Sequence, residues 1–189
     1  MPSPADRLLI AATELFAAQG IRAVGIDRVL REAGVAKASL YGSYGSKDGL
    51  VIAYLEELDR ADRNRWRAAI ESVDDPRDRV LTFFDLAIAG GPVRNFRGCQ
   101  YANAATEFPD EDLPPVLEHR EWVLDTLAGQ LDELGVATPR AWAAQIQVIY
   151  DGALAGSKMA RSVQPIVIGR AMADGIVDQA LNRPWSGRH

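Results

Sequence analysis

Residues 20 to 50 read GIRAVGIDRVLREAGVAKASLYGSYGSKDGL, and this stretch decides the expected fold. Its first half has apolar residues at the i, i+3, i+4, i+7 spacing of one helix face, namely Ile26, Val29, Leu30 and Ala33. Gly34 follows where the C-terminus of a helix needs a residue that tolerates positive φ. A second helix is expected from about Ala36 to Tyr44. The pattern therefore predicts two short helices joined by a tight turn.

The second helix is expected to bury Leu40 and to expose a polar face that includes aromatic rings. Ser46 is placed to cap a further helix, which begins near Lys47. A lysine in a first turn opposes the helix dipole, so Lys47 suggests an anionic partner bound near the helix N-terminus. A single lysine or serine on a helix is usually only solvated, but the order of the whole set suits the phosphates and base edges of DNA. The candidate DNA-contacting residues are Arg28, Lys37, Ser39, Tyr41, Ser43, Tyr44 and Lys47.

The string AGVAKASLYGSYGSKDGL closely resembles the DNA-binding signature of TetR-family transcriptional regulators. The preceding segment fits the apolar and aromatic first helix of that family through Ile10, Ala11, Leu15, Phe16 and Gly20. The resemblance implies that Lys37 and Ser39 lie at the major groove of DNA and that Tyr41 and Lys47 hold phosphates. It also implies that Tyr44 is the aromatic residue that closes the recognition helix.

The chain departs from the family pattern at four positions of this region. Gly25 and Ala36 stand where the family often has Thr or Ser, and Gly42 and Ser43 replace commoner bulky or imidazole side chains. Between residues 96 and 110, FRGC followed by NAATEFPD resembles a recurring segment in one group of TetR-like regulators. This second resemblance supports the family and identifies no ligand.

Composition and charge agree with a globular DNA-binding protein that acts as a homodimer. The 189 residues are 48% hydrophobic and 25% charged, and the net charge is −5. The first 50 residues have six basic and five acidic side chains, a net charge of +1, so the remainder carries −6. Phosphate contacts supply most non-specific affinity for DNA, so this weakly basic N-terminal region predicts modest non-specific binding. DNA binding is then expected to depend on two copies of the region acting together.

Several other classes of protein are disfavoured. The sequence has no run of about 18 apolar residues that would span a membrane, and its start lacks the features of a secretion signal, so a cytoplasmic protein is expected. The single cysteine, Cys99, excludes an intramolecular disulfide and a cysteine-rich metal cluster. Only two histidines are present, so no metal site and no cofactor are expected. No glycine-rich phosphate loop or convincing catalytic set indicates an enzyme.

Beyond Lys47 the sequence has helical periodicity and no alternating strand pattern. Further helices are expected at about residues 47–73, 76–89, 99–107, 113–134 and 139–162, and a last one starts near Pro165. Together with the resemblance, these segments predict an all-α fold of about nine helices. Residues 1–46 would form a three-helix helix-turn-helix DNA-binding domain, and residues 47–189 a helical ligand-binding and dimerisation domain.

Two groups of residues in the second domain are candidates for binding. An apolar and aromatic set with hydroxyl groups would bind a small-molecule effector, although plain core packing is an equal alternative: Phe83, Phe84, Ile88, Cys99, Tyr101, Phe108, Trp122 and Tyr150. A second set recurs at helical spacing in the last two helices and would pair with its copy in a four-helix dimer interface: Trp142, Ile146, Ile149, Ala153, Gly156, Ala160, Met172 and Ile176.

These features predict a ligand-responsive transcriptional regulator. We expect a repressor that binds a pseudo-palindromic double-stranded operator as a dimer and is released by a small-molecule effector. One alternative is a helical small-molecule carrier or enzyme with a degenerate DNA-binding head. Another is a redox-sensing regulator based on Cys99, since Arg94 and Arg97 are close to it in sequence and would favour a thiolate.

Overall fold

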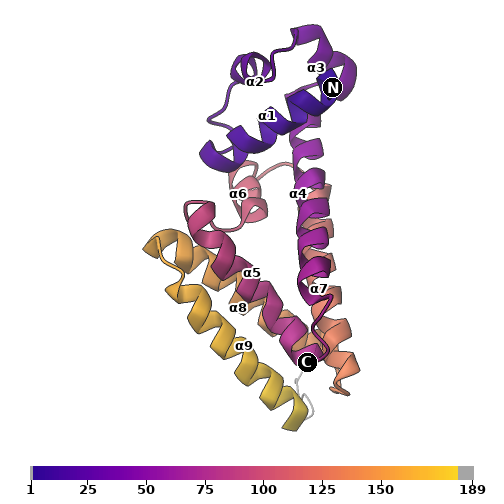
Figure 1. Ribbon diagram of the computed structural model, residues 1–189, viewed down its shortest axis with the longest axis vertical. Helices are drawn as coiled ribbons and strands as arrows, with labels where there is room; N and C mark the ends of the chain where they lie inside the picture. Colours follow the sequence, from indigo (N-terminus) through magenta and orange to yellow (C-terminus); the bar gives the residue numbers. More distant parts are fainter. Residues whose placement is uncertain (1, 183–189) are drawn as a thin grey trace. The chain divides into compact units, whose positions relative to one another are not determined.

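The computed structural model describes residues 2–182, and in this part of the chain every regular element is a helix (Figure 1). The all-α class and the expected number of helices are confirmed. The nine helices, in chain order, are α1 (Pro4–Gln19), α2 (Ile26–Ala33), α3 (Lys37–Tyr44), α4 (Lys47–Ile70), α5 (Pro76–Val93), α6 (Gln100–Glu107), α7 (Pro114–Glu133), α8 (Pro139–Ala160) and α9 (Gln164–Asn182).

The chain forms two compact units, and neither is continuous in sequence. The head unit comprises residues 1–62 and 100–118, and the body unit comprises residues 63–99 and 119–189. This division differs from the boundary at residues 46 and 47 expected from the sequence. The first part of α4 belongs to the head because Leu50, Val51 and Tyr54 are buried in its core. The short helix α6 also belongs to the head, although the chain reaches it only after α5.

The head unit is built on α1 and the start of α4. Ser3 and Asp6 form a reciprocal capping box at the start of α1, and Pro4 follows the cap, where its missing N–H costs nothing. The buried face of α1 includes Leu8 and Phe16. The Phe16 ring meets the ring of Tyr54 edge to face, with 5.5 Å between the ring centroids. This buried contact fixes α4 against α1.

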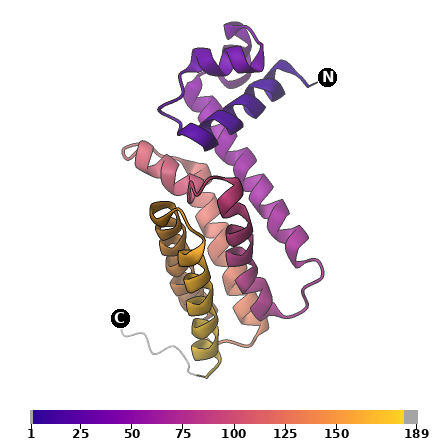
Figure 2. The ribbon, with the colours of Figure 1, turned by 60° about the vertical axis from the view of Figure 1, so that its left-hand side comes forward.

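The body unit has a core shared by α5, α7, α8 and α9. Helices α8 and α9 lie side by side along most of their length, and α5 contacts both (Figure 2). The most deeply buried side chains come from all four helices: Phe84, Leu127, Leu131, Ile146, Ile166 and Val177. An ion pair adds a polar link, since Arg77 on α5 bonds the carboxylates of Asp174 and Asp178 on α9 at 2.6 and 2.7 Å.

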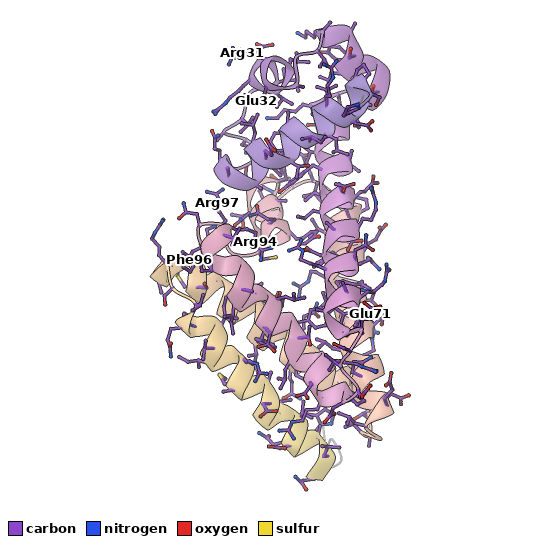
Figure 3. The ribbon with its side chains drawn as sticks, viewed as in Figure 1. Arg31, Glu32, Glu71, Arg94, Phe96 and Arg97 are labelled. Atoms are coloured by element: carbon purple, nitrogen blue, oxygen red, sulfur yellow. The ribbon has the colours of Figure 1, made fainter. Side chains whose placement is uncertain are left out.

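Helix α5 continues past the point where the sequence suggested an end. It was expected to stop before Gly90, Gly91 and Pro92, but it runs through them to Val93. Pro92 lies in the last turn, which closes through hydrogen bonds from the Arg94 N–H to the Gly90 carbonyl and from the Phe96 N–H to the Gly91 carbonyl. The loop that follows is unusual because Asn95 and Phe96 both have positive φ, 52° and 55°. Figure 3 labels Arg94, Phe96 and Arg97 at this loop.

No helix in residues 2–182 combines the length and the apolar composition that crossing a membrane would require.

Candidate nucleic-acid interface

The turn between α2 and α3 has the geometry that the sequence predicted. Gly34 adopts the left-handed conformation, with φ 61° and ψ 41°. Its N–H donates to the Arg31 carbonyl at 3.3 Å, and the Val35 N–H donates to the Leu30 carbonyl at 3.2 Å. These bonds end α2 and redirect the chain into α3 within three residues. The result is a helix-turn-helix in which α3 is the second, exposed helix.

Helix α3 is anchored by one fully buried side chain and exposes several of its other side chains to solvent. Leu40 is almost completely buried, whereas Lys37, Tyr41 and Ser43 are exposed and Ser39 is half-buried. The Lys37 ammonium lies 5.9 Å from the centroid of the Tyr41 ring, one helical turn away, so the two side chains form a cation–π pair. Together they present a positive charge and a phenol on the exposed surface of the helix.

The N-termini of both short helices are without side-chain caps. Gly25 and Ala36 occupy the two N-cap positions, and neither residue has a side-chain acceptor. Four backbone N–H groups begin every helix without an intrahelical partner, so uncapped ends are suited to bind anions such as DNA phosphates. Near the start of α2, Arg28 is exposed and its guanidinium donates to the Gln19 side chain at 2.6 Å. Figure 3 labels the neighbouring exposed residues Arg31 and Glu32 on α2.

Tyr44 and Lys47 have partners inside the head unit. The Tyr44 hydroxyl donates to the Ala5 carbonyl at 2.9 Å, and burial, with a smaller contribution from Asp6, raises the pKa of this phenol. The Lys47 ammonium donates to the Ile21 carbonyl at 3.0 Å and lies 6.0 Å from the centroid of the Phe16 ring. Both residues therefore hold helices of the head together, a role that the sequence did not indicate for Lys47.

Glu107, the last residue of α6, is a contact residue that the sequence analysis did not identify. Its carboxylate accepts the Ile21 N–H at 3.2 Å and the Arg22 N–H at 2.6 Å. The next residue, Phe108, lies beneath the Arg22 guanidinium, 5.1 Å from the ring centroid. No local pattern can reveal a bond between residues 85 positions apart, so only the fold identifies this contact.

The candidate effector residues are divided between the two units. Phe83, Phe84, Trp122 and Tyr150 form one aromatic cluster in the body, with ring centroids 5.2 to 6.1 Å apart in the contacting pairs. Ile88 and Cys99 are half-buried against the same core. Tyr101 and Phe108 belong instead to the head.

Trp66 joins the aromatic cluster, although the sequence did not single it out. Its ring stacks on Phe83 with a centroid distance of 5.5 Å and meets Trp122 edge to face at 6.3 Å. Trp66 is only 8% exposed, and its indole N–H has no hydrogen-bond partner among the described residues. On the other side of the cluster, the Arg63 guanidinium lies 5.0 Å from the Trp122 ring centroid.

Five of the eight expected dimer-interface residues pack against the core of the body. Trp142, Ile146 and Ala153 are buried in its core, so their side chains are not available to a second copy. Ile149 and Ile176 are partly buried against the same core, and Gly156 faces Pro165. Ala160 and Met172 are exposed. Most residues of the expected interface therefore pack within their own chain, and the position of a dimer interface stays a prediction. The large apolar side chains that α8 and α9 leave exposed are Val148, Met159, Val167, Ile168, Met172 and Leu181.

Comparison with known proteins agrees with this architecture. Residues 8–54 match the family model for bacterial regulatory proteins of the tetR family. A solved TetR-family transcriptional regulator from Streptomyces coelicolor is 34% identical, with a TM-score of 0.85 over 93% of this chain and 94% of that one. The HTH-type transcriptional regulator LmrA of Bacillus subtilis is 25% identical over 86% of this chain and 90% of its own length. The HTH-type transcriptional activator FasR of Mycolicibacterium smegmatis is 37% identical over 42% of this chain and 38% of its own.

The helix-turn-helix head and the regulators that resemble the chain define it as a DNA-binding transcriptional regulator rather than an enzyme. Among such regulators, the chain belongs to the TetR family.

Proposed function

We propose that the protein is a cytoplasmic, effector-controlled repressor that binds a pseudo-palindromic operator as a homodimer. The observation that carries this proposal is the surface of α3, where Lys37 and Tyr41 are exposed on a helix that Leu40 anchors from behind. An exposed helix with a fixed backbone can enter the major groove, and its lysine can reach guanine acceptors or phosphates. The relative FasR is named an activator, so repression rather than activation is itself a part of what we propose.

Exposed apolar side chains on the last two helices support the homodimer. Met159 on α8 is 81% exposed, and Ile168 and Met172 on α9 are more than half exposed and one helical turn apart. Soluble proteins rarely expose several large apolar side chains on neighbouring helices unless a partner covers them. A second copy, related by a two-fold axis, would cover this surface and bring a second recognition helix to the operator.

The aromatic cluster of the body supports control by a small molecule. Phe83, Trp122 and Tyr150 supply ring faces, and the Trp66 N–H is a buried donor without a partner among the described residues. A buried donor that lacks an acceptor is costly, and a bound ligand with an acceptor would remove that cost. We infer that the effector is an apolar molecule with a hydrogen-bond acceptor, and that it binds better to the state in which the heads do not fit the operator.

Selection of genomic fragments by the purified protein tests the function directly. The selected fragments should share a two-fold symmetric sequence, and binding should weaken as the salt concentration rises. Fluorescence anisotropy on one such fragment would then compare Lys37→Ala and Tyr41→Ala with the wild type. We expect each variant to lose about tenfold or more in affinity, as when a contact to a base edge or phosphate is removed from both heads.

Lys158→Ala is the matched control, because Lys158 is an exposed lysine on α8 of the body unit. This control should bind the fragment as the wild type does. Unchanged binding by both Lys37→Ala and Tyr41→Ala would refute the assignment of α3 as the DNA-reading helix.

A further inference from the structure

Helix α6 is a structural part of the head, yet the body flanks it in sequence on both sides. Residues 100–118 belong to the head unit, whereas residues 63–99 and 119–189 belong to the body unit. The chain therefore passes from the body into α6 at Gln100 and returns to the body after Glu118. Helix α6 is therefore joined by the backbone to residues of the body on both sides.

The turn between α1 and α2 is held by side chains from two other helices. Glu107 on α6 accepts the Ile21 and Arg22 N–H groups at 3.2 and 2.6 Å. Lys47 on α4 donates to the Ile21 carbonyl at 3.0 Å. Ile21 is only 3% exposed, and both its N–H and its carbonyl are hydrogen-bonded within the head unit. The turn is thus fixed at its amides by α6 and at its carbonyl by α4.

The shape of the turn suits this contact. Gly20 ends α1 with φ 95° and ψ 154°, a positive-φ conformation that glycine adopts readily. A Cβ atom at residue 20 would lie 3.0 Å from Oε1 of Glu107, so the carboxylate sits directly against the turn. The Arg22 guanidinium over the Phe108 ring adds a second contact between the same two segments.

We propose that Glu107 is a positioning residue for DNA binding, through which α6 sets the orientation of α2 and α3 relative to α1. Ile21 and Arg22 are separated from the start of α2 by only three residues, so a displaced Glu107 carboxylate displaces the helix-turn-helix. Hydrogen bonds from two backbone N–H groups to one carboxylate are charge-assisted and directional, which makes the contact stiffer than apolar packing alone. The inference rests on the proposed DNA-binding function.

The test compares Glu107→Ala and Glu107→Gln with the wild type. Glutamine keeps one acceptor oxygen but presents an amide to the second backbone N–H, so it should show an intermediate effect. Glu111→Gln removes the same charge four residues away, at an exposed position beyond the end of α6, and is the matched control. Hydrogen exchange and DNA affinity would be measured for all four proteins at full length, with a genomic fragment that the wild type selects.

In Glu107→Ala, amide exchange at residues 20–24 should become about tenfold faster, the effect expected when a charge-assisted hydrogen bond near the weak end of its range is lost. Affinity for the selected fragment should fall by about the same factor, while binding to unrelated DNA should change little because the phosphate-binding side chains remain.

Each outcome decides one part of the proposal. Faster exchange at residues 20–24 with wild-type DNA affinity would show that Glu107 is only structural, and the proposal would fall. Equal loss of affinity in Glu111→Gln would attribute the effect to net charge and would also overturn it. If the wild type itself selected no DNA, the proposed function would fail first, so the two failures are distinguishable.

Discussion

The first turn of α3 provides a quantitative test of how the recognition helix is stabilised. Ala36 occupies the N-cap with φ −74° and ψ 153°, the extended backbone from which serine, threonine and aspartate cap helices. Helix α3 has only eight residues, with no acidic residue in its first turn and no basic residue in its last. We therefore expect Ala36→Ser to stabilise the head, because the new hydroxyl oxygen accepts a backbone N–H of the first turn.

The size of the effect follows from the bonds already present. Replacing a capping serine by alanine usually costs about 0.5–2 kcal/mol. The Ser39 N–H already donates to the Ala36 carbonyl at 2.9 Å, so the hydroxyl gains mainly the Ala38 N–H. We expect a gain of about 0.5–1 kcal/mol in the free energy of unfolding, near the lower end of the range. For a unit of this size, such a gain raises the unfolding midpoint by about 2–8 °C.

Thermal unfolding followed by two probes would isolate the head. The head unit contains no tryptophan, so tryptophan fluorescence reports only on the body, whereas far-ultraviolet circular dichroism reports on the helices of both units. In Ala36→Ser, the dichroism transition should move to higher temperature by more than the fluorescence transition.

Ala18→Ser is the control, since Ala18 is an exposed residue in the last turn of α1. Serine at that position cannot cap an N-terminus, and its weaker helix propensity should lower stability by a few tenths of a kcal/mol. A midpoint for Ala36→Ser that is equal to the wild type, or below it, would refute the reasoning that α3 is limited by its uncapped N-terminus.

Three further substitutions test other parts of the molecule. Met172→Glu should convert the proposed dimer to monomers, because it places a charge in the exposed apolar surface of α8 and α9. Light scattering after size exclusion would measure this, and Leu117→Glu, at an exposed leucine of the head, should leave the proposed dimer intact. Thr138→Asn should raise the unfolding midpoint of the body by about 2–4 °C, because a β-branched residue at φ 54° is strained and asparagine tolerates that conformation. A lower midpoint, measured by tryptophan fluorescence during thermal unfolding, would contradict this. Cys99→Ser should leave the response of DNA binding to hydrogen peroxide unchanged, and loss of a response that the wild type shows would identify Cys99 as a sensor.

Local patterns were sufficient to predict the helix-turn-helix. The spacing of Val29 and Leu30, the glycine at residue 34 and the buried Leu40 each depend on neighbours within one or two helical turns, so the sequence contains the whole motif. The end of α5 was predicted too early, because glycine and proline usually end a helix, whereas here Arg94 and Phe96 close the last turn over Pro92.

Contacts distant in sequence were not predictable. Ile146 and Met172 both lie on apolar helical faces, and periodicity cannot distinguish a face that packs on its own chain from one that a second chain covers. The hydrogen bond from Lys47 to the Ile21 carbonyl was not predictable, because the two residues lie 26 positions apart in sequence. The membership of α6 in the head was hidden for the same reason.

The discontinuous head also constrains the order in which the protein is built. The bond between Glu107 and Ile21 spans 86 residues, so the first three helices leave the ribosome long before α6 exists. At about 5–20 residues per second, the turn after α1 waits roughly 4–17 s for its carboxylate partner. During that interval, α5 has been synthesised but α7, α8 and α9 have not. The turn after α1 therefore acquires its carboxylate partner on α6 only after α5, the first complete helix of the body, has been synthesised.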